Sequence, residues 1–145
     1  MRRTLFLVLI LALPFRALAD ADVPRPETAS PDYNLGADAI QAKDWGAAVY
    51  HLSIVVRQEP TNADAQNLLG YAYRNQKKYD LALQHYNEAL RLDPSHKGAL
   101  EYAGETYVLM GDRAKAQQNL AALERICGKS CEQYQDLARA IAKAQ

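Results

Sequence analysis

The sequence lacks a concentration of charge of either sign. Its 17 Lys and Arg residues balance its 17 Asp and Glu residues. After Arg2-Arg3, the only adjacent basic pair is Lys77-Lys78. A nucleic-acid groove needs a basic patch or stripe, so we expect no nucleic-acid partner.

The motifs of several enzyme classes are also missing. The chain has only seven glycines, with no phosphate-cradling glycine loop, and no serine stands in a Gly-x-Ser-x-Gly setting. The three histidines, His51, His85 and His96, lack a further ligand at the spacing that a zinc site requires. We therefore predict no catalysis, no metal site and no other cofactor.

Long apolar runs are absent except at the start of the chain. A basic beginning, an apolar run from Leu5 to Leu13 and the small-residue string Ala17-Leu18-Ala19 are typical of a cleavable signal peptide over residues 1–19. The run is shorter than the roughly 18 to 20 residues of a membrane span. We expect export to the periplasm or the medium, followed by a disordered leader over residues 20–29 and no membrane span after cleavage. Cleavage would remove three basic residues and no acid, leaving the chain about three units negative.

Cysteine is scarce, because Cys127 and Cys131 are the only two. Paired thiols in exported proteins usually close, and Gly128 and Ser130 between them favour a helix end, a turn and a new helix start capped by Ser130. We predict a structural disulfide across this turn. Free or metal-binding thiols and a redox-active pair are the alternatives, although a Cys-x-x-Cys motif is missing.

What the sequence does contain is a repeat with a period of 34 residues. At this offset Leu35-Gly36, Leu69-Gly70 and Ala103-Gly104 fall in register. Small residues at such positions let two helices approach closely where they cross. Other residues in register are Ala48, Ala82 and Ala116, then Leu52, Tyr86 and Leu120, and finally Pro60 and Pro94.

Helix signals divide each repeat into two helices. Ser30-Pro31 has the form of a cap and first residue of a helix that ends near Ala42. Second helices are predicted over about 45–58, 79–92 and 113–127, with Asp44 and Asp112 as caps. The prolines that follow the first two prevent them from continuing.

This pattern resembles the tetratricopeptide repeat, a helix–turn–helix unit. The resemblance covers repeats of about 29–62, 63–96 and 97–130 and is strongest in the middle one. It implies an all-α solenoid of three repeats, closed by a capping helix over about 131–143. The outer polar face of that cap would carry Glu132, Gln135, Asp136, Arg139 and Lys143.

The resemblance also implies a concave groove lined by the first helix of each repeat. Tyrosine and arginine there would suit an interface, although a merely solvated face is the alternative. The clamp with which some tetratricopeptide co-chaperones hold a terminal carboxylate is missing, because its places hold Tyr33, Ala37, Leu68, Gly98 and Tyr102. The expected groove residues are Tyr33, Ala37, Ile40, Asp64, Asn67, Tyr71, Arg74, Glu101, Glu105 and Val108.

The leading functional hypothesis is an exported scaffold that binds a segment of another envelope or secreted protein in this groove, without turnover. An accessory factor in thiol or cytochrome maturation, acting through Cys127 and Cys131, is the alternative. Self-association into a homo-oligomer is a third possibility. Because one scaffold serves many partners, the sequence does not name the partner.

Overall fold

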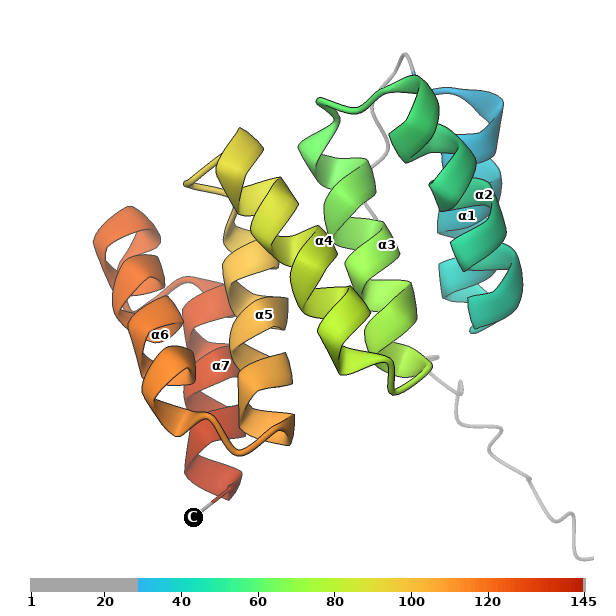
Figure 1. Ribbon diagram of the computed structural model, residues 1–145. Coiled ribbons are helices and arrows are strands. Elements are labelled where there is room, and N and C mark those ends of the chain that lie inside the picture. The colour runs from blue at the N-terminus through green and yellow to red at the C-terminus, as the bar shows by residue number, and fades with distance from the viewer. Residues whose placement is uncertain (1–28, 145) are drawn as a thin grey trace, which may run out of the picture.

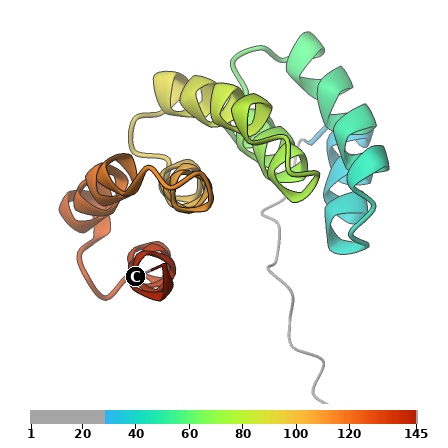
Figure 2. The same ribbon diagram turned by 60° about the horizontal axis from the view of Figure 1, so that its bottom comes forward.

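The computed structural model describes residues 29–144, which contain seven α-helices and no strand. Successive helices pack as antiparallel pairs along an arc, and the last helix lies on its inner side beside α5 (Figures 1 and 2). The all-α solenoid is therefore confirmed. The helices are α1 (Pro31–Gln41), α2 (Trp45–Gln58), α3 (Ala63–Asn75), α4 (Tyr79–Leu92), α5 (Lys97–Leu109), α6 (Arg113–Cys127) and α7 (Glu132–Lys143).

The expected signal peptide and most of the expected leader lie outside the described residues. No helix of residues 29–144 combines the length and the apolar character needed to cross a membrane.

Side-chain caps fix most of the helix starts. Asp44 and Asp112 accept hydrogen bonds from the backbone N–H of Ala47 and Lys115, as predicted. The caps at the starts of α1, α3 and α5 are Ser30, Asn62 and His96. The second helices of the three repeats start 34 residues apart, at Trp45, Tyr79 and Arg113.

The turn inside each repeat needs a residue with a positive φ angle, and that residue recurs at the same offset. Lys43 has a φ of 58°, Lys77 of 61° and Gly111 of 79°. Only glycine adopts this region without a steric cost. The first two repeats therefore accept a strained lysine where the third has glycine.

Close helix crossings are centred on the repeated glycines. A Cβ atom added at Gly36 would lie 2.7 Å from Leu52 Cγ, and one at Gly70 would lie 2.7 Å from Tyr86 Cε1, so both glycines face the second helix of their own repeat. The third crossing differs from the expectation. The atoms nearest to a Cβ at Gly104 belong to Leu137 of α7, at 2.5 Å, because α7 packs directly against α5.

One polar tie per repeat joins the first helix to the second at equivalent positions. Each second helix supplies a polar side chain that bonds to the residue 19 positions earlier in the first helix. The histidines at the first two of these positions therefore hold helices together. The ties are His51 Nδ1 to Asp32 Oδ1 at 2.8 Å, His85 Nδ1 to Gln66 Oε1 at 2.8 Å, and Asn119 Nδ2 to the Leu100 carbonyl at 3.0 Å.

The buried apolar side chains form three adjoining clusters along the solenoid. Tyr33 and Leu69 belong to the first, Tyr86 to the central one, and Leu123 and Leu137 to the last. Each cluster is built from neighbouring helices, as expected for a quasi-one-dimensional repeat array.

The junction between α6 and α7 carries the bridge between Cys127 and Cys131, whose Cα atoms are 5.8 Å apart. Gly128 turns the chain with a φ of 76°. The expected cap at Ser130 is wrong, because α7 starts one residue later and Cys131 occupies the N-cap position. Ser130 instead lies exposed in the turn.

Candidate functional site: a pocket on the concave side

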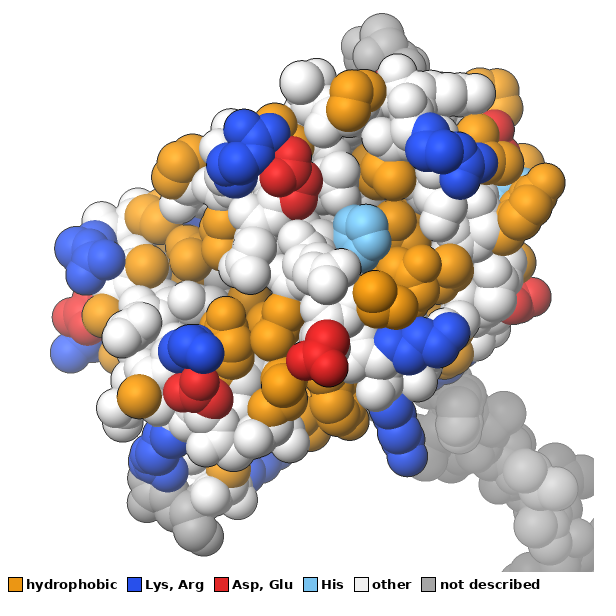
Figure 3. Space-filling view, viewed as in Figure 1, with side chains coloured by type: hydrophobic (Ala, Val, Ile, Leu, Met, Phe, Trp, Pro, Cys, Tyr) orange, Lys and Arg blue, Asp and Glu red, His pale blue; other side chains and the backbone are white. Residues whose placement is uncertain are grey.

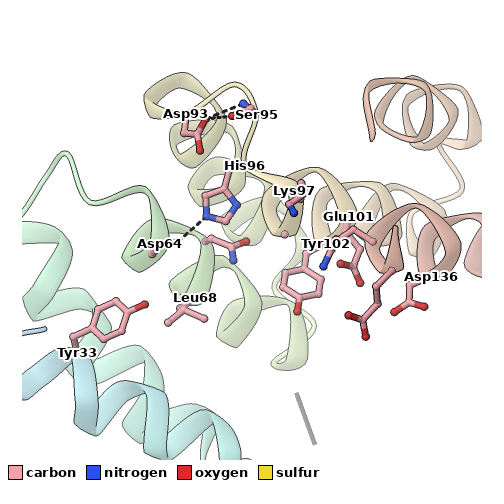
Figure 4. Close-up of a pocket in the computed structure, with 14 residues that line it drawn as sticks. Tyr33, Asp64, Leu68, Asp93, Ser95, His96, Lys97, Glu101, Tyr102 and Asp136 are labelled. Carbon is pink, nitrogen blue, oxygen red and sulfur yellow. Dashed lines mark hydrogen bonds and ion pairs between the residues drawn. The ribbon is translucent and has the colours of Figure 1, made fainter. Parts of the chain in front are cut away.

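A pocket of about 750 Å³ opens along the inner side of the arc. It is formed by α1, α3, α5 and α7 together with the loop between α4 and α5, with Tyr33 at one end and Asp136 at the other (Figure 4). The volume is in the range of ordinary ligand sites. Its lining residues are Tyr33, Asp64, Asn67, Leu68, Asp93, Ser95, His96, Lys97, Gly98, Glu101, Tyr102, Glu132, Gln133 and Asp136.

The lining is acidic: it contains five carboxylates and one lysine. The face shown in Figure 3 differs, because hydrophobic side chains there are interspersed with charges of both signs and neither sign gathers into a patch. Clefts lined by charge of one sign concentrate ligands of the opposite sign. The electrostatic character of the pocket therefore favours a cationic ligand group.

Two of the five carboxylates are already satisfied at the rim by the loop between α4 and α5. Asp93 accepts hydrogen bonds from the Ser95 N–H at 2.9 Å and the Ser95 hydroxyl at 2.7 Å. Asp64 lies 3.1 Å from His96 Nε2. His96 Nδ1 accepts the Ala99 N–H, so a neutral His96 must carry its proton on Nε2, which then donates to Asp64. This hydrogen bond holds the pKa of Asp64 below its usual value.

Glu101 is the buried carboxylate of the pocket, and it has no such partner. Its side chain lines the pocket near Tyr102 and Asp136 (Figure 4), and the residue is only 7% exposed. No other residue in 29–144 donates a hydrogen bond to it or pairs with it. Burial, aided by the negative charge of Glu105, raises its pKa from 4.5 to about 7.

Asn67 is a second buried polar group whose hydrogen bonds are incomplete. It is also 7% exposed, and its Oδ1 atom has no hydrogen-bond partner within the described part of the chain. Gly98 faces its amide, since a Cβ atom at that position would lie 3.3 Å from Asn67 Nδ2. An unsatisfied buried amide costs free energy, and a ligand with a polar backbone would remove that cost.

An aromatic–ionic cluster lies beside the pocket, and we define it by Tyr71, Arg74, Tyr102 and Glu105. Arg74 bonds to Glu105, and its guanidinium carbon lies 5.3 Å from the Tyr71 ring centre and 5.4 Å from that of Tyr102. Burial lowers the pKa of Arg74, but Tyr86 and Glu105 outweigh that effect and raise it above its usual value. The cluster joins α3 to α5, so it stabilises the solenoid.

The residues expected in the groove thus fall into three groups. Tyr33, Asp64, Asn67 and Glu101 line the pocket. Tyr71, Arg74 and Glu105 form contacts within the cluster. Ala37 and Ile40 are buried in the first core cluster, and Val108 packs against the last one.

The pocket also contains residues that were not expected there. Glu132 and Asp136 were assigned to the outer face of the cap, and that assignment is wrong because α7 leans against α5 and turns both residues to the pocket. Lys97 and the His96 loop were missed, although the proline before this loop marks a chain reversal. The register of the repeat contained no signal for the contact between α7 and α5.

Three comparisons place the fold. Residues 63–96 match the family model of the tetratricopeptide repeat. A DnaJ protein P58IPK homolog of Arabidopsis thaliana is 34% identical over 55 residues, which is 38% of this chain and 11% of that protein. The chain therefore spans about a tenth of the curated relatives that it matches.

Solved structures agree over most of the chain. The Arabidopsis OM64 TPR domain has a TM-score of 0.72 at 15% identity, covering 79% of this chain and 93% of that one. The first TPR of Spaghetti (RPAP3), bound to the HSP90 peptide SRMEEVD, has a TM-score of 0.70 at 17% identity, covering 78% and 91%. These likenesses concern the fold.

The fold and its concave inner side define an α-helical repeat solenoid. Residues 63–96 match the tetratricopeptide repeat, and the solved tetratricopeptide domains share the fold of the chain.

Proposed function

We propose that this chain is an exported scaffold that holds a segment of a partner protein in the pocket on its concave side. The observation that carries the proposal is the pair Glu101 and Asn67, two polar side chains that are buried in the pocket wall without complete partners. Buried polar groups are almost always hydrogen-bonded. A bound segment would supply the missing partners.

The shape of the site supports a chain segment as the ligand. The pocket runs past three repeats and the cap, from Tyr33 of α1 to Asp136 of α7, so an extended peptide could contact every first helix in turn. Tetratricopeptide domains of the same fold bind peptides, as in the RPAP3 complex. The proposal assigns no turnover to the pocket.

Export belongs to the proposal on the strength of the basic and apolar start of the chain. It places the partner among envelope or secreted proteins. The bridge between Cys127 and Cys131 joins α6 to α7 and does not line the pocket. We therefore give it a structural role rather than one in thiol or cytochrome maturation.

Photocrosslinking in the native cell tests the proposed function. A photoreactive residue at Gln133, which lines the pocket, should capture a distinct partner band. The matched control is the same residue at Gln84, an exposed glutamine of α4 outside the pocket. A partner captured equally at both positions, or at neither, would contradict the proposed function, and a band with twice the mass of the chain would point to self-association instead.

A further inference from the structure

We propose that the pocket recognises a lysine or arginine side chain of the bound segment and that the Glu101 carboxylate is the anchor for this cation. The inference rests on the proposed function and specifies the chemistry of its ligand. It is carried by the placement of Glu101, which is 7% exposed, has no hydrogen-bond partner in residues 29–144 and faces the pocket from α5.

The charges around Glu101 explain why an added cation fits. The charged side chains that act on it are Glu105 of α5, Arg74 of α3, and Glu132 and Arg139 of α7. Both cations are engaged elsewhere, because Arg74 bonds to Glu105 and Arg139 bonds to Asp136. A carboxylate in this position gains from a charge-assisted hydrogen bond, which is stronger than a neutral one.

The site favours an organic cation over a metal ion. In the described part of the chain no group of three or more His, Cys, Asp or Glu side chains converges as metal ligands would. A single buried carboxylate with an amide nearby instead matches an ammonium or guanidinium group on a peptide. Asn67 would then bond to the backbone of the same segment.

The polarity of this pocket also separates the chain from the RPAP3 domain of similar fold. That domain is bound to the peptide SRMEEVD, which carries three acidic residues and one basic residue. Here the wall carries five carboxylates against Lys97, so a segment of that composition would meet charge of its own sign. Specificity in this chain therefore favours the opposite charge.

Blocked pentapeptides test the inference. Ac-Ala-Ala-Lys-Ala-Ala-NH2 and its arginine counterpart are titrated into the protein lacking residues 1–19, and amide shifts are followed by NMR. The norleucine peptide, which keeps the length of lysine without its charge, should bind at least tenfold more weakly. Equal binding of the lysine and norleucine peptides, tighter binding of the glutamate peptide, or no binding of any of them would overturn the inference.

Variants assign the effect to one carboxylate. Glu101→Gln should weaken the lysine peptide at least tenfold, while Glu132→Gln at the exposed rim should weaken it about twofold, because a solvated charge contributes less. Glu124→Gln makes the same charge change on exposed α6, outside the pocket, and should leave binding unchanged. Equal losses from Glu101→Gln and Glu124→Gln would mean that only net charge matters.

Two further measurements show whether a loss of binding comes from misfolding, from failure of the proposed function or from failure of this inference. Glu101→Asp keeps the charge but withdraws it by one methylene, and we expect intermediate binding with an unchanged helical circular dichroism spectrum. If the photoreactive residue at Gln133 still captures a partner but the peptide titrations show no preference for lysine or arginine, the proposed function stands and this inference is wrong. If capture fails as well, both fall.

Discussion

Two glutamates one helical turn apart on α5 have opposite surroundings. Glu105 is bonded to Arg74, which lies over two tyrosine rings in the aromatic–ionic cluster. Glu101, four residues earlier, lies in the pocket with no such partner. The comparison shows that one stripe of a repeat helix can hold the solenoid together at one position and leave a carboxylate unpaired in the pocket at another.

Arg74→Ala should produce the largest effect, because it removes the ion pair with Glu105. Removing one member of a largely buried ion pair leaves the other charge uncompensated, and we expect a loss of about 3 kcal/mol in the free energy of unfolding. Urea denaturation measures it. Arg91→Ala removes a solvent-exposed ion pair to Glu88, and because such pairs contribute little to stability, its loss should be much smaller. Similar losses in both variants would show that the cluster has no special weight.

Gly104→Ala should disturb the pocket, because it displaces α7, which forms one wall of the pocket. The new Cβ atom would meet Leu137 Cδ2 at 2.5 Å in a packed core, and overpacking of this kind costs about 2 kcal/mol. Gly46→Ala is the control, because its Cβ would have only the Asp44 side chain as a neighbour, at 3.5 Å, and helix propensity should stabilise it by up to about 1 kcal/mol. Unchanged thermal unfolding of Gly104→Ala would contradict the observed crossing.

Glu101→Gln should change how stability depends on pH. The pKa of Glu101 is about 7 in the folded chain against an ordinary 4.5, so the folded state binds the proton more tightly. Its stabilising contribution is complete below pH 4.5 and is lost as the pH rises through 7. At pH 8 the glutamine variant should therefore be more stable than the wild type by on the order of 2 kcal/mol, and at pH 4 the two should converge.

The control for that experiment is Glu124→Gln, whose side chain is exposed. Urea denaturation of all three proteins at pH 4, 6 and 8 isolates the contribution of Glu101 from other titrating groups. A difference between wild type and Glu101→Gln that stays constant across this range would contradict the raised pKa.

Tyr86→Phe should have the smallest effect, and it tests whether the Tyr86 hydroxyl contributes to the aromatic–ionic cluster. Tyr86 is fully buried next to Tyr102, with 6.3 Å between the ring centres, and its hydroxyl has no hydrogen-bond partner in residues 29–144. Deleting this hydroxyl removes an unpaired polar group, so a gain of about 1 kcal/mol is expected in thermal unfolding. A loss instead would mean that the hydroxyl supports Arg74.

The fold was predictable because its signals are local. The Asp44 and Asp112 caps, the two prolines and the repeated glycines all act within a few residues or one repeat, and the helices at 45–58, 79–92 and 113–127 have the predicted bounds. The start of α7 was misplaced by one residue because Ser130 looked like a cap. A capping preference is a local signal, so it does not determine at which residue the packed helix begins.

The site was predictable only in part, for a different reason. Sequence register indicates that Glu101 and Glu105 share a helix face, but it does not show that Arg74, 31 residues from Glu105, pairs with one of them. Nor does it show that α7 packs against α5 so that Glu132 and Asp136 line the pocket. Both facts depend on how helices far apart in the sequence pack together, as Leu137 of α7 packs against Gly104 of α5.

The polar ties between paired helices have a consequence for how such a chain can diverge. An aspartate, a glutamine and a main-chain carbonyl all serve as the acceptor, and a histidine or an asparagine faces them. The spacing of 19 residues is the same in all three repeats, whereas the donor and acceptor groups differ. Duplication of a repeat therefore also duplicates the hydrogen bond between its two helices, and no new contact has to evolve there.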